Sequence, residues 1–107
     1  MTYDDFIDRK SKFLYYKQRV DDVTKRQPLH LLEHFEKRGP TGKSGAYHID
    51  HIISIRYGFH AGIDPEVIGD IKNLRFIPWR QNLIKSSKHT VESAEMMQYF
   101  IENGSIC

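Results

Sequence analysis

The sequence contains little cysteine and lacks any long apolar run. Its single cysteine, Cys107, excludes an internal disulfide and a structural zinc site built on Cys-x-x-Cys pairs. No apolar segment approaches the roughly 18 to 20 residues that cross a bilayer. Residues 1–8 are acidic, whereas a signal peptide is basic and then apolar. We therefore expect no membrane contact and a cytoplasmic location.

A strong net charge is also missing, although the basic residues are unevenly spread. The chain of 107 residues carries 16 Lys and Arg against 14 Asp and Glu, a formal net charge of +2. Residues 72–88 contain no acidic side chain but several basic ones, namely Lys72, Arg75, Arg80, Lys85 and Lys88. This local basic strip predicts a polyanionic partner.

The composition that is present is that of an ordinary folded protein. Apolar residues make up 39% of the chain and charged residues 28%, which excludes the disordered and fibrous classes. At this length we expect one domain, 1–107. Within it, residues 1–44 form a helical brace, 45–88 the core of the fold and 89–107 a C-terminal helix. The expected fold class is α+β.

Helical patterns mark both ends of the chain. The apolar spacing over residues 3–20 predicts one amphipathic helix that serves as a scaffold. A second helix is expected from Pro28 to Gly39, with Leu31, Leu32 and Phe35 on one face, followed by a glycine-rich loop to residue 45. Thr90 is expected to cap a last helix that ends at Asn103-Gly104. One face of this helix is expected to carry Val91, Ala94, Met97 and Ile101.

The central part of the chain has the pattern of strands. Residues 47–53 alternate large apolar or aromatic side chains with polar ones, which predicts a half-buried strand. Ile49 is expected to face the core of that strand, and His48 and Asp50 to face away.

A long connection and a second strand follow. Gly58 and Gly62 are expected turn points, and residues 64–66, Asp-Pro-Glu, are typical of a helix start. Residues 74–77 predict the second strand. Pro78 then opens a helix that continues to about Ser87.

Together these elements form a ββα unit that carries an acid, a base and two amides. Asp50 and His51 lie on the first strand, Asn73 at the entry to the second, and Asn82 and Lys85 on the helix. An imidazole of ordinary pKa can deprotonate water near neutral pH, so His51 is a candidate general base for phosphodiester hydrolysis. Carboxylate and amide oxygens suit a hard divalent ion, so Asp50 and Asn82 are candidate ligands of one Mg²⁺ or Mn²⁺.

The same residues carry a resemblance to a known family. The chain resembles the HNH, or ββα-metal, nucleases through residues 48–53 (His-Ile-Asp-His-Ile-Ile), 72–74 (Lys-Asn-Leu) and 82–85 (Asn-Leu-Ile-Lys). It is more similar still to the free-standing HNH homing endonucleases of bacteriophages, through residues 54–59 and 65–69, and the HNH domain of CRISPR effectors has the same Asp-His, Asn, Asn order. The resemblance implies that Asn73 serves catalysis structurally, by tying the connection between the strands so that the His51 ring points at the scissile phosphate.

Further basic residues are candidates for contacts with DNA. Lys85 and Lys88 follow Asn82 on one helical face and are expected to bind phosphates. Arg80, Arg56 and Lys43 are weaker candidates. His48 shares a strand face with Asp50, so it either lies near the metal ion or a phosphate or has no role. The other histidines are expected to be solvated, namely His30, His34, His60 and His89.

The expected function is a metal-dependent DNA endonuclease that makes a nick or a double-strand break. The alternative is a non-catalytic DNA-binding or regulatory module that keeps the HNH fold. DNA is the expected partner in both cases, and a dimer or a larger assembly stays open. If a phage encodes the chain, the expected location is the cytoplasm of the host cell.

Overall fold

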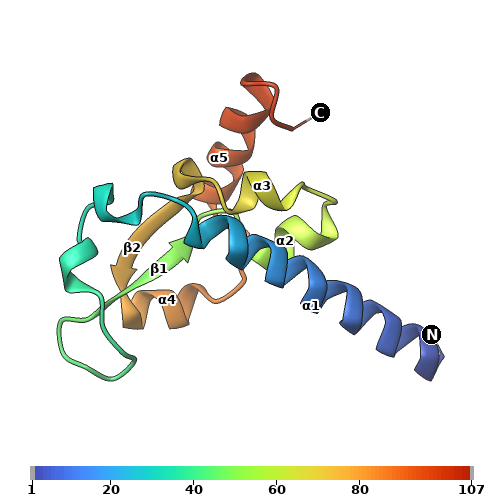
Figure 1. Cartoon of the computed structure of the whole chain (residues 1–107), viewed down its shortest axis with the longest axis horizontal. Coiled ribbons are helices and arrows are strands. Elements are labelled where there is room, and N and C mark those ends of the chain that lie inside the picture. Colours follow the sequence, from blue (N-terminus) through green and yellow to red (C-terminus); the bar gives the residue numbers. More distant parts are fainter. Residues whose placement is uncertain (1, 107) are drawn as a thin grey trace.

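The computed structural model describes residues 2–106, so Cys107 lies outside the described residues. As expected, the fold is α+β (Figure 1). In chain order the elements are α1 (Tyr3–Lys25), the 3₁₀ turns η1 (Leu29–Leu31) and η2 (Phe35–Lys37), β1 (Tyr47–His51), α2 (Ile55–His60), α3 (Pro65–Ile68), η3 (Ile71–Asn73), β2 (Leu74–Pro78), α4 (Trp79–Lys85) and α5 (Val91–Glu102). Among the described residues, no helix combines the length and the apolar character needed to cross a membrane.

The two strands form an antiparallel pair that brings distant polar residues together. Asp50 lies opposite Arg75, and His51 lies opposite Leu74. Helix α4 begins directly after β2 and packs back against both strands (Figure 1). The predicted order of strand, connection, strand and helix is therefore confirmed.

The apolar core lies beside the sheet, between the C-terminal half of α1 and the helices of the connection. Its buried residues include Val20 from α1, Ile53 after β1, Ile68 from α3 and Phe100 from α5. The first turns of α1 lie outside this core and extend beyond the other elements (Figure 1). Thr2 and Asp5 cap that exposed end with a reciprocal capping box.

Two expectations about the connection and the N-terminal region are wrong. The second helix is absent, because His34 adopts a left-handed conformation (φ 68°) and Leu32 an extended one, and these residues interrupt a continuous helix. Gly58 lies inside α2 and is not a turn point. A Cβ at this position would lie 2.5 Å from the Tyr16 hydroxyl, so the close packing of α1 on α2 requires glycine.

Other local predictions have mixed outcomes. Gly62 is a turn with φ 69°, and Asp64 and Thr90 cap α3 and α5 as predicted. The buried face of α5 is rotated from the expected one. Ser93 and Phe100 are buried, whereas Val91, Ala94 and Ile101 are exposed.

Candidate active site

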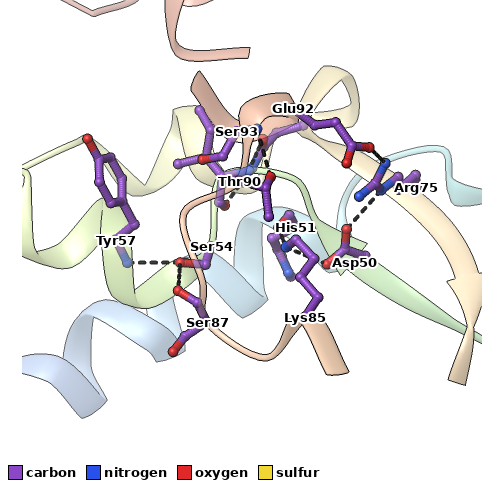
Figure 2. Close-up of polar contacts among 12 residues, drawn as sticks. Asp50, His51, Ser54, Tyr57, Arg75, Lys85, Ser87, Thr90, Glu92 and Ser93 are labelled. Carbon is purple, nitrogen blue, oxygen red and sulfur yellow. Dashed lines mark hydrogen bonds and ion pairs between the residues drawn. The ribbon is translucent and has the colours of Figure 1, made fainter. Parts of the chain in front are cut away.

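Asp50 is the centre of a buried polar network at the end of the sheet. Its side chain is only 3% exposed. Oδ2 accepts a hydrogen bond of 2.9 Å from Nε of Arg75, and Oδ1 accepts one of 2.8 Å from Nζ of Lys85. Arg75 also pairs with Glu92 from α5, as Figure 2 shows. The buried carboxylate is therefore held between two cations, which compensate its charge.

This network corrects the expected facing of the first strand. Asp50 is buried, whereas Ile49 is only half-buried and lines two cavities. The alternation predicts the opposite facing because apolar side chains usually face inward. Here the inward position belongs to the acid, because Arg75 on the paired strand and Lys85 on α4 supply its charge partners.

Lys85 also lies where the sequence did not predict it. Its side chain is 9% exposed, and Nζ donates a second hydrogen bond, of 2.9 Å, to the backbone carbonyl of His51. Lys85 therefore lines the smaller cavity beside Asp50 as an ion-paired side chain, and its expected contact with a phosphate stays a prediction. Lys88, the other expected phosphate contact on this segment, is exposed.

His51 extends from the last position of β1 toward α1. Its Nε2 lies 3.0 Å from Oγ1 of Thr24, and the Thr24 hydroxyl donates to the carbonyl of Val20 at 2.8 Å. Because a hydroxyl has one proton, Thr24 Oγ1 must accept from the Nε2 hydrogen of His51. This arrangement selects the tautomer in which Nδ1 carries no proton and has a lone pair available.

The environment of His51 keeps its ring neutral. Burial lowers the pKa of His51 to about 4, and the nearby carboxylates of Asp50 and Asp21 oppose this effect only in part. The Nδ1 atom forms no hydrogen bond with the described residues, and among these residues no buried side-chain nitrogen or oxygen lacks a partner. Nδ1 therefore reaches solvent as an unprotonated base.

Two cavities meet at His51 and Asn82. The smaller one, of about 250 Å³, is lined by Asp50, His51, Asn82, Lys85 and Arg56, among others. The larger one, of about 500 Å³, lies between β1 and the end of α1, and its lining includes Thr24 and His48. The side chain of Asn82 forms no hydrogen bond with the described residues, so its amide is available to a ligand in either cavity. We call the smaller cavity the candidate active site.

Asn73 is fully buried and lines neither cavity. Its Oδ1 accepts from the backbone N–H of Ile53 at 2.8 Å, and Nδ2 donates to the carbonyls of Ile53 and Ile68 at 3.1 and 2.8 Å. The side chain thereby ties the start of β2 to the segment after β1 and to the end of α3. Asn73 therefore ties together the connection between the strands, and the catalytic role that the resemblance implies stays a prediction.

The remaining sequence candidates are dispersed. Arg56 lines the candidate active site and lies over the ring of Phe13, 4.2 Å from its centroid. His48 lines the larger cavity, which Asp50 does not line, and its Nε2 lies 3.5 Å from Oγ1 of Thr41. Other candidates are exposed and line neither cavity, namely Arg80, Lys43 and Lys88.

Thr24 contacts the expected base His51, and Arg75 contacts the expected metal ligand Asp50. The sequence predicts neither contact. Arg75 belongs to the basic strip. Its contact with Asp50 depends on the register of the two strands, which places Arg75 opposite Asp50 and which the sequence alone does not specify. Thr24 lies on α1, which the apolar spacing predicts only as a scaffold. No local signal in the sequence links it to His51, which is 27 positions away.

The donor set of the candidate active site suits one hard divalent cation. The Asp50 carboxylate and the Asn82 amide both line the cavity, and oxygen donors of this kind are typical of Mg²⁺ or Mn²⁺ sites that keep several waters. No group of three or more His, Cys, Asp or Glu residues suited to a metal ion occurs among residues 2–106. A cation held here therefore depends on two protein oxygens and shares Asp50 with Lys85.

Comparisons of this chain with family models, curated proteins and solved structures gave no match.

Proposed function

We propose that the chain is a metal-dependent DNA endonuclease of the HNH (ββα-metal) type that hydrolyses phosphodiester bonds. The observation that carries this proposal is the state of His51. Nε2 lies 3.0 Å from Thr24 Oγ1, so Nδ1 is the ring nitrogen left for a water molecule, and His51 lines the candidate active site. Asp50 and Asn82 line the same cavity, so a base and two oxygen donors meet where one phosphodiester can bind.

In the proposed reaction, Nδ1 of His51 removes a proton from a water molecule. The water oxygen forms a bond to phosphorus while one ester P–O bond breaks, and the departing oxygen takes a proton from solvent. His51 then releases its proton to solvent. The products are a phosphate monoester and an alcohol, so one water is consumed and the base is regenerated.

Asp50 and Asn82 are the proposed ligands of one Mg²⁺ or Mn²⁺. When bound, such an ion neutralises charge that develops on the phosphate and the leaving oxygen. Arg75 keeps the Asp50 carboxylate oriented through a bond to Oδ2, which leaves Oδ1 as the oxygen that faces Lys85. Asn73 supports the arrangement by fixing the backbone beyond β1.

Basic side chains in this cavity and elsewhere on the exposed surface are the proposed contacts to the DNA backbone. Arg56 lines the cavity itself, and Arg80, Lys88 and Lys43 are exposed. Because phosphate contacts give affinity without reading sequence, these residues account for binding and not for a preferred cleavage sequence.

A second candidate function has one observation in its favour. Asp50 is neutralised by Lys85 and Arg75, so the cavity has no unpaired negative charge to attract a divalent ion. A non-catalytic DNA-binding module would keep this ion-paired state permanently.

Cleavage of supercoiled plasmid separates the two functions. The endonuclease predicts nicked or linear products with Mg²⁺ or Mn²⁺ and none with excess EDTA, while circular dichroism shows an unchanged fold. DNA binding without cleavage under any divalent ion would instead establish the binding module. Undiminished cleavage in EDTA would contradict the metal requirement.

A further inference from the structure

A further hollow, separate from the two cavities at His51, lies on the N-terminal half of α1, where the helix faces α2. It has a volume of about 530 Å³. We call it the α1 groove. Its basic lining consists of Arg9, Lys10, Arg56 and His60, and no acidic side chain lines it. Phenylalanine rings are interleaved with these groups, notably Phe6 and Phe13.

The α1 groove is continuous with the candidate active site. Phe13 and Arg56 line both hollows, and the guanidinium of Arg56 lies over the Phe13 ring at their junction. A strand that leaves the cavity of His51 past Arg56 therefore enters the groove directly.

Helical spacing explains why this surface is both basic and open. Phe6, Arg9, Lys10 and Phe13 recur at intervals of three and four residues and share one face of α1. Asp8 lies on another face, where it pairs with Lys12 at 3.0 Å. The first turns of α1 extend beyond the other elements (Figure 1), and Phe6 is 55% exposed.

Cations interleaved with exposed aromatic rings fit a single strand better than a duplex. Basic side chains follow the phosphates of either form, but a ring such as Phe6 can stack only on a base that is not already stacked in a duplex. We infer that the α1 groove binds a single-stranded segment of DNA next to the phosphodiester that is cut. This inference rests on the proposed nuclease function and specifies its substrate.

Equilibrium binding in EDTA tests the groove without cleavage. A blunt duplex is compared with the same duplex carrying an overhang of about ten unpaired nucleotides, by fluorescence anisotropy at several salt concentrations. The overhang should bind more tightly to the parent chain. Phe6→Ala should weaken overhang binding roughly five- to tenfold, because it removes a stacking surface. The double variant Arg9→Ala with Lys10→Ala should lower the log-log salt slope by about 1.4.

The opposite face of α1 offers matched controls. Tyr15 is nine positions from Phe6, half a turn out of phase, and is 68% exposed. Tyr15→Ala and the double variant Lys12→Ala with Arg19→Ala remove the same kinds of group from the same helix. Both should leave overhang binding unchanged.

The outcomes distinguish this inference from the proposed function. Equal affinity of the parent chain for both DNAs, with no effect of the groove variants, overturns the groove even if the chain cleaves plasmid. The groove inference is also overturned if the groove variants bind DNA like the parent but lose a self-association that the parent shows in sedimentation. That result would assign the groove to a second copy of the chain. If the parent binds neither DNA and cleaves no plasmid, the proposed function itself fails.

Discussion

The ammonium group of Lys85 lies 2.8 Å from Oδ1 of Asp50, and both side chains are almost fully buried. Arg75 binds the other carboxylate oxygen. Lys85 and Asn82 both line the candidate active site, and Lys85 is bonded to Oδ1. A divalent cation that Asp50 and Asn82 hold there would therefore compete with Lys85 for Oδ1. The proposed metal site is therefore coupled to the position of one lysine.

Replacing Lys85 should tighten metal binding. In Lys85→Met the cation no longer displaces a charge-assisted hydrogen bond, so the Kd for Mn²⁺, measured by calorimetry, should fall roughly tenfold. Without metal the variant should lose about 2 to 3 kcal/mol of unfolding free energy, because Asp50 keeps only Arg75 as a charge partner.

Lys88→Met is the matched control, because Lys88 is exposed and takes no part in the Asp50 network. It should change neither the Kd for Mn²⁺ nor the unfolding free energy. Unaltered Mn²⁺ affinity in Lys85→Met would show that the two cations do not compete for Asp50.

Thr24 should set the tautomer of His51. Thr24→Val keeps the side-chain shape but removes the oxygen that accepts from Nε2. We expect a cleavage rate lower by roughly 10- to 100-fold, as for lost supporting contacts of a functional ring, with Mn²⁺ affinity unchanged. Thr24→Ser should restore the rate. ¹⁵N chemical shifts of the ring test the tautomer, and a Thr24→Val spectrum identical to that of the parent would refute this role.

Asn73 should be indispensable for stability. Asn73→Ala leaves the backbone N–H and carbonyl of Ile53 and the carbonyl of Ile68 without partners in a fully buried position. We expect a loss of about 3 kcal/mol or more of unfolding free energy in urea. Asn103→Ala, which removes one exposed amide contact, should cost well under half of that. A small effect at Asn73 would mean that water satisfies these groups.

The stability of the chain should fall as the medium becomes acidic. Burial lowers the pKa of His51 to about 4 from an ordinary 6.5. Between these values the unfolded chain binds a proton that the folded chain does not, so the unfolding free energy decreases as the pH falls from 6.5 to 4. The decrease attributable to His51 is on the order of 3 kcal/mol.

His51→Gln provides the comparison, because glutamine keeps an N–H donor but does not titrate. Urea unfolding in EDTA should show a shallower decline for this variant than for the parent between pH 6.5 and 4. Parallel curves would exclude His51 as the source of the pH dependence.

Features encoded locally could be predicted from the sequence. The strands around Asp50 and Arg75 follow from alternation, and the caps Asp64 and Thr90 follow from helix-start chemistry. The resemblance implies that Asn73 ties the connection between the strands, and its three buried hydrogen bonds do so; its effect on His51 stays a prediction.

Features that depend on distant partners could not be predicted. The burial of Asp50 requires Arg75 and Lys85, which are 25 and 35 positions away. The local pattern does not contain these partners and therefore predicts that Ile49 faces inward and Asp50 outward. The predicted second helix failed because His34 adopts a left-handed conformation that helical periodicity does not reveal. The α1 groove likewise exists only because α2 packs beside a helix that the sequence marks as scaffold.

The central claim is that His51 is the general base, and the single-turnover cleavage rate of His51→Ala with Mg²⁺ tests it most directly. DNA affinity and Mn²⁺ affinity, measured in parallel, should stay close to those of the parent, because Asp50, Asn82 and the basic residues remain. The cleavage rate should fall by about 10² to 10⁴. His30→Ala, which removes an exposed imidazole, should cleave at the parental rate. A His51→Ala chain that cleaves as fast as the parent would contradict the account.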